Sequence, residues 1–105
     1  MGKMSKREEI RKDLLDQLDR NGTCGKQYED LVEVYMQLWD TVRDLTAEID
    51  EKGVMIKYQN GENQFGWRKN DSVSERNRTI NQMLKVLSQL DLKPSPKDDN
   101  IPDEM

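Results

Sequence analysis

The sequence predicts a mainly α-helical fold: a helical hairpin with one long amphipathic helix, then a short β-hairpin and a C-terminal helix. Apolar residues recur at helical spacing from Lys26 to Lys52, alternate after Gly53, and return to helical spacing after Ser72. With 105 residues, of which 33% are hydrophobic and 36% charged, the chain can build only a thin core. We therefore expect one small domain, residues 1–92, that gains stability by self-association.

The first helix is predicted by its caps. Ser5 and Glu8 match a capping box ahead of an apolar face. That face consists of Ile10, Leu14, Leu15 and Leu18. Asn21-Gly22 supplies the residues that end a helix, and Gly25 permits a turn into the next one. The two helices should form a hairpin-like pair.

The long second helix carries an apolar stripe with the a, d and e pattern of a heptad. Besides Val32, the stripe contains eight residues that we take as oligomerisation candidates: Tyr28, Leu31, Tyr35, Leu38, Trp39, Val42, Leu45 and Ile49. The chain has only two other short amphipathic segments to cover it. Another copy of the protein should therefore bury part of the stripe.

The β-hairpin is predicted by alternation on either side of the turn signal Asn60-Gly61. The alternating residues are Val54, Ile56 and Tyr58 before the turn, and Phe65 and Trp67 after it. Because so small a hairpin needs its aromatic residues as core, we expect Phe65 and Trp67 to pack against the helices. The alternative is a base-stacking surface of Tyr58, Phe65 and Trp67, formed together with the neighbouring cations Lys57, Arg68 and Lys69.

The third helix should begin at a second capping box, Ser72 and Glu75, and run to about Asp91. Its apolar face consists of Val73, Ile80, Met83, Leu84, Leu87 and Leu90. Beyond Leu92 the chain holds three prolines and mostly charged residues. Residues 93–105 are therefore predicted to form a flexible acidic tail.

Several classes of function are disfavoured by the residue inventory. The chain has no histidine and a single cysteine, Cys24, so a zinc site or an imidazole relay is not available. The segment Gly22-Thr23-Cys24-Gly25-Lys26 follows a helix and is too short for a phosphate-binding loop. The mean hydropathy is −1.03, which argues against a membrane span or a signal peptide. We expect a soluble intracellular protein that is not an enzyme and holds no metal or cofactor.

Charge is distributed unevenly, because residues 1–12 carry +3 while residues 13–53 carry −7. A basic end with a second basic segment near residue 70 is typical of a surface for an anionic polymer. The candidate DNA-binding residues are Lys3, Lys6, Arg7, Arg11, Lys12, Arg68, Lys69, Arg76 and Arg78. Ordinary solvated surface is the alternative.

Six segments follow one another in a recognisable order: Asp13–Leu18, Tyr28–Val32, Tyr35–Asp40, Gly53–Gly61, Lys69–Val73 and Gln82–Lys85. This succession consists of a tyrosine-rich long helix, a Gln-Asn-Gly hairpin, a Lys-Asn-Asp-Ser helix start and a Leu-Lys-Pro exit. It resembles the small subunit of bacteriophage terminases, in the class common in phages with long non-contractile tails.

The resemblance implies a non-catalytic packaging factor in the cytoplasm of an infected or lysogenic bacterial host. Such a factor forms a ring, recognises viral double-stranded DNA at the packaging start, and regulates the ATPase and nuclease of the terminase large subunit. Many small terminases have a separate helix-turn-helix unit, whereas here only 25 residues precede the long helix. A structural oligomer or protein adaptor that binds no nucleic acid is the second hypothesis.

Overall fold

The computed structural model describes residues 3–92, so the predicted acidic tail, 93–105, lies outside the described residues. The elements, in chain order, are α1 (Lys6–Arg20), α2 (Lys26–Lys52), β1 (Met55–Gln59), β2 (Phe65–Lys69) and α3 (Asp71–Gln89). The predicted class, mainly helical with one β-hairpin, is confirmed.

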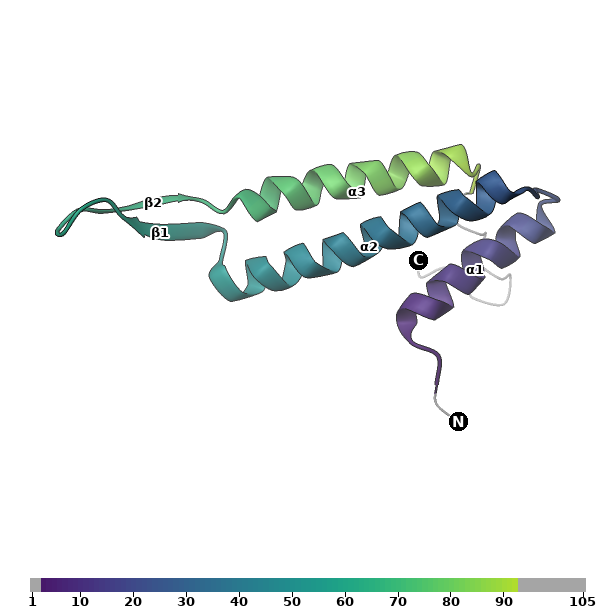
Figure 1. Ribbon diagram of the computed structural model, residues 1–105, viewed down its shortest axis with the longest axis horizontal. Coiled ribbons are helices and arrows are strands. Elements are labelled where there is room, and N and C mark those ends of the chain that lie inside the picture. The colour runs from purple at the N-terminus through teal and green to yellow at the C-terminus, as the bar shows by residue number, and fades with distance from the viewer. Residues whose placement is uncertain (1–2, 93–105) are drawn as a thin grey trace, which may run out of the picture.

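The long helices α2 and α3 run antiparallel beside each other, as Figure 1 shows. Helix α1 packs against the amino-terminal part of α2, while the hairpin of β1 and β2 extends beyond the opposite end of the helix pair (Figure 1). The molecule therefore has a helical body and a projecting hairpin.

The core lies at the end of the body where all three helices meet. It consists of Leu14 and Leu18 from α1, Val32 and Met36 from α2, and Leu90 and Leu92 at the end of α3. Asp91 adopts a left-handed conformation with φ of 56°. The chain turns there, and the Leu92 amide donates to the Leu87 carbonyl at 3.1 Å, which places Leu92 in the core.

The ends of α1 and α2 follow the sequence signals. The Glu8 amide donates to Ser5 Oγ at 3.1 Å, and the Ser5 amide donates to Glu8 Oε1 at 3.3 Å, which completes the predicted capping box. Gly22 and Gly25 have φ of 74° and 130°, in the region that disfavours L side chains. The predicted helix stop and helix start are therefore confirmed, and α2 ends before Gly53 as expected.

The hairpin pairs β1 and β2 antiparallel, with Lys57 opposite Trp67 and Gln59 opposite Phe65. The predicted packing of Phe65 and Trp67 against the helices is wrong, because these side chains are 57% and 63% exposed. The reason is position: the strands lie beyond the ends of α2 and α3, so no helix surface covers them (Figure 1).

Asn70 joins the hairpin to the helical body. It also shows that α3 begins earlier than the sequence predicted. Its side-chain oxygen accepts from the Ser72 amide at 3.0 Å, so Asn70, and not Ser72, is the N-cap. Its Nδ2 donates to the Gly53 carbonyl at 2.8 Å, and its amide donates to the Val54 carbonyl at 2.8 Å. The predicted capping box of Ser72 and Glu75 fails because the buried Asn70 caps the helix two residues earlier.

Candidate nucleic-acid interface

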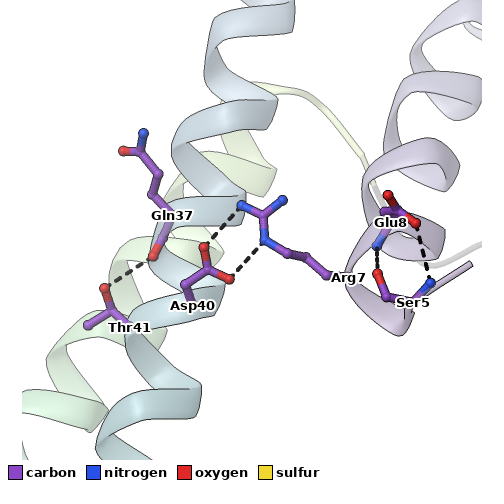
Figure 2. A network of polar contacts seen from close by, with 6 residues as sticks. All are labelled: Ser5, Arg7, Glu8, Gln37, Asp40 and Thr41. Atoms are coloured by element: carbon purple, nitrogen blue, oxygen red, sulfur yellow. Dashed lines mark hydrogen bonds and ion pairs between the residues drawn. The ribbon is translucent and has the colours of Figure 1, made fainter.

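Arg7, one of the candidate cations of the amino end, reaches from α1 to α2 and binds Asp40. Its Nε donates to Oδ1 at 2.9 Å and its Nη2 donates to Oδ2 at 3.0 Å (Figure 2). This two-point geometry fits the planar guanidinium to the carboxylate. The hydrogen bonds from Arg7 hold the pKa of Asp40 below its usual value, and the same hydrogen bonds raise the pKa of Arg7.

Two further cations of α1 also have acidic partners. Arg11 Nε lies 2.6 Å from Glu33 Oε2 on α2. Lys12 Nζ lies 3.1 Å from Asp16 Oδ2, one turn along α1. Much of the positive charge of the amino end is therefore compensated within the chain.

Asp40 and Glu33 are not among the residues that the sequence analysis selected. The sequence held a usable signal, because an offset of seven from Glu33 to Asp40 on α2 and an offset of four from Arg7 to Arg11 on α1 each return to one helix face. In an antiparallel pair of helices, such faces can oppose each other. The arginines therefore help to hold α1 against α2.

Lys3 and Lys6 are exposed, as Arg11 is, but within the described part of the chain they differ from these arginines in having no acidic partner. Within residues 3–92, neither lysine has a carboxylate within ion-pair distance. Of the five candidates at the amino end, these two are the cations most available to a phosphate.

The other four candidates lie far from α1 along the body, on β2 and the first half of α3 (Figure 1). Arg68 Nη1 is 3.8 Å from Asp71 Oδ2, and Arg78 Nη1 is 2.7 Å from Glu75 Oε2. Arg76 is half-buried, and its enclosed Nε has no hydrogen-bond partner in the described part of the chain. Lys69 belongs to the exposed hairpin. The structure thus separates the nine candidates into two regions instead of joining them.

The ion pair of Arg7 and Asp40 predicts a pH dependence of stability. The folded-state pKa of Asp40 is depressed, so the pair stabilises the protein above the unfolded-state pKa of about 4, and this stabilisation is lost as the pH falls through the lower folded-state value. Asp40→Asn should therefore be less stable than wild type in urea unfolding at pH 7, and the difference should shrink below about pH 4.

Asp16→Asn serves as the matched control, because it removes an ion pair that stays within α1 and joins no two helices. Its effect at pH 7 should be smaller than that of Asp40→Asn. A stability difference for Asp40→Asn that is the same at pH 7 and pH 3 would contradict the assigned role of the pair.

The eight oligomerisation candidates of α2 are all half-buried in the single chain. Four of them, Tyr28, Leu31, Tyr35 and Trp39, pack against the core cluster. Burial raises the pKa of the Tyr35 phenol above its ordinary value. The other four, Leu38, Val42, Leu45 and Ile49, are not among the residues that pack against the cluster, and the last three lie beyond Trp39 on α2. All eight side chains therefore keep some exposed surface, and only four of them pack against the core cluster.

Residues 23–26 line an open groove between the end of α1 and the start of α2. Leu15, Leu18 and Tyr28 contribute apolar surface to the groove, and Asp19 and Glu29 contribute carboxylates. Among residues 3–92, no three His, Cys, Asp or Glu side chains gather where they could hold a metal ion. No helix of the described residues is long and apolar enough to cross a membrane.

The comparison with known families decides the identity of the chain. The family model described as phage terminase, small subunit, matches residues 8–101, which is most of the sequence. The chain belongs to the phage terminase small subunit family. The resemblance inferred from the ordered segments is thereby confirmed. No match was found among curated proteins or among solved structures.

Membership in the family gives this terminase small subunit a role in phage DNA packaging. The family implies phage DNA and the terminase large subunit as partners. Small subunits of this family are generally non-catalytic components of the packaging machinery.

Proposed function

We propose that this terminase small subunit assembles into a ring, binds viral double-stranded DNA at the packaging start, and regulates the ATPase and nuclease of the large subunit in the cytoplasm of the bacterial host. The observation that carries the proposal is the apolar stripe of α2. After α1 and α3 have packed on α2, Leu38, Val42, Leu45 and Ile49 remain only half-buried. A second copy that covers them would extend the thin core, and a repeated head-to-tail contact closes a ring.

The proposed contact with duplex DNA uses the exposed lysines of the amino end, Lys3 and Lys6, one set from each subunit. Two cations per chain give weak binding, with a dissociation constant of roughly 10⁻⁴ M or weaker at physiological salt. Several such sites on one ring can raise the overall affinity by about 10² to 10⁴. Assembly and DNA binding are therefore coupled in this proposal.

A salt titration with a long phage-derived duplex tests the contact. The double variant Lys3→Gln/Lys6→Gln should bind more weakly than wild type and with a shallower dependence on salt, because fewer counterions are released. Arg7 and Arg11 are left intact in this variant, since replacing them would also break their ion pairs with α2. Unlike a neutralisation of the whole cluster, the double variant removes charge without loosening α1.

The control variant Lys26→Gln/Lys85→Gln removes the same charge from two exposed lysines outside the candidate set. It should keep the wild-type salt slope. If Lys3→Gln/Lys6→Gln also keeps the wild-type affinity and slope, the amino end is not the DNA surface. Arg68, Lys69, Arg76 and Arg78 then become the candidates.

A protein adaptor that binds no nucleic acid is the second candidate function. It is favoured by the pairing of Arg7 and Arg11 with acids of α2, which leaves little uncompensated positive charge on α1. An adaptor predicts that the wild-type protein binds no duplex even at low salt. Duplex binding at the lowest salt concentration of the same titration therefore distinguishes the two functions.

A further inference from the structure

The register of the hairpin gathers two aromatic rings and two lysines on one face. Side chains of a strand alternate between faces, and directly paired residues share a face. The pairs Met55 with Lys69, Lys57 with Trp67, and Gln59 with Phe65 therefore define one surface, which we call the aromatic face. It has no carboxylate.

The other face of the hairpin is organised differently. It presents Tyr58 opposite Gly66, and a Cβ atom at Gly66 would lie only 2.7 Å from atoms of the Tyr58 ring. The absence of a side chain at Gly66 thus lets the Tyr58 ring pack across the strands. On the aromatic face no such packing covers Phe65 and Trp67, which stay more than half exposed.

One lysine ammonium of the aromatic face lies over an aromatic ring. Lys57 Nζ lies 4.7 Å from the centroid of the Phe65 ring, within the range of a cation–π contact. Within residues 3–92, neither Lys57 nor Lys69 has a carboxylate within ion-pair distance. Both ammonium groups are therefore available to an anionic ligand that also covers the rings.

We propose that the aromatic face binds single-stranded DNA, with bases stacked on Phe65 and Trp67 and phosphates held by Lys57 and Lys69. Single-stranded nucleic acid offers π-faces and negative charges along one backbone, which matches this pattern of rings and lysines. Phe65 and Trp67 are two residues apart on one strand, about 7 Å, so each ring can take a base of its own. The site is distinct from the duplex contact proposed for α1.

Tryptophan fluorescence tests stacking directly, with an oligothymidylate as the probe. The chain has two tryptophans, Trp39 on α2 and Trp67 on the aromatic face. Binding should quench the wild-type emission, and this quenching should be lost in Trp67→Leu, which retains Trp39. Measured by the anisotropy of a labelled oligothymidylate, Trp67→Leu and Phe65→Leu should each weaken binding at least about fivefold.

Lys57→Gln should weaken binding and reduce its salt dependence, whereas Lys85→Gln, which removes the same charge from exposed surface of α3, should not. Because Phe65 and Trp67 contribute little to the core, their variants should keep the wild-type helix content and melting temperature. Binding of the oligothymidylate by Trp67→Leu and Phe65→Leu with wild-type affinity would overturn the proposal. So would the absence of binding by wild type at low salt.

A change in solution mass of the hairpin variants without a change in oligothymidylate affinity would also overturn it, and would assign the face to a contact between copies. The salt titration with duplex DNA is interpreted separately from the oligothymidylate experiment. Loss of duplex binding in Lys3→Gln/Lys6→Gln with unchanged oligothymidylate binding supports both sites. Oligothymidylate binding by a wild-type protein that does not bind duplex would contradict the proposed packaging contact and leave the aromatic face standing.

Discussion

Leu38→Asp is expected to reduce the solution mass of the assembled protein to that of a single chain. Leu38 is half-buried on α2 and is not among the residues of the apolar stripe that pack against the core cluster. In the proposed ring, each interface would bury an unpaired carboxylate, at a cost of several kcal/mol. Light scattering at fixed protein concentration measures the mass, and Val42→Asp should have the same effect.

Gln37→Asp is the matched control, since it introduces the same charge at an exposed position next to Leu38. It should leave the mass of the wild-type assembly unchanged. Circular dichroism is recorded for each variant because the stripe also supplies core residues to the single chain. A folded Leu38→Asp variant with wild-type mass would place the interface elsewhere, and a wild-type mass of one chain would remove the ring.

Met36→Ala should cause the largest loss of folding stability among single truncations of α2. The Met36 side chain is 0% exposed and lies in the cluster with Val32 and Leu90. Truncating a fully buried methionine costs about 2–5 kcal/mol through lost contacts and the remaining cavity. In a domain whose total stability is on the order of 5–15 kcal/mol, this loss should be evident in urea unfolding.

Leu84→Ala provides the comparison, because Leu84 is also a long apolar side chain but is 58% exposed on α3. Its effect should stay within about 0.5 kcal/mol. Both variants are compared at one protein concentration, since assembly adds to the apparent stability. Equal losses for Met36→Ala and Leu84→Ala would show that the core does not centre on Met36.

The ends of α1 and α2 were predictable because their causes are local. The Ser5 and Glu8 capping box, the helix stop at Gly22 and the end of α2 before Gly53 each depend on a few neighbouring residues. The class of each element followed from the period of its apolar residues. Family membership was also within reach, since it rests on the order of segments along the chain.

What the sequence could not supply depends on how the elements are placed in space. The alternating sequence pattern of a strand is the same whether or not a helix covers the strand. The exposure of Phe65 and Trp67 therefore followed only from the position of the hairpin. The stripe predicted a buried α2 face without Met36, whereas contacts with α1 and α3 centre on Val32 and Met36. The partners Arg7 and Asp40 are 33 residues apart, and their contact depends on the crossing of two helices.

The hydrogen bonds of Asn70 to Gly53 and Val54 join the end of α2 to the start of α3 at the base of the hairpin. The strands contribute no residue to the core cluster of the helical body. Substitutions between Met55 and Lys69 change no residue of the core cluster. Selection can therefore act on the hairpin and on the body separately. New side chains or a longer turn in the hairpin can alter the proposed contact with single-stranded DNA, while the helices that are proposed to join the subunits keep their sequence.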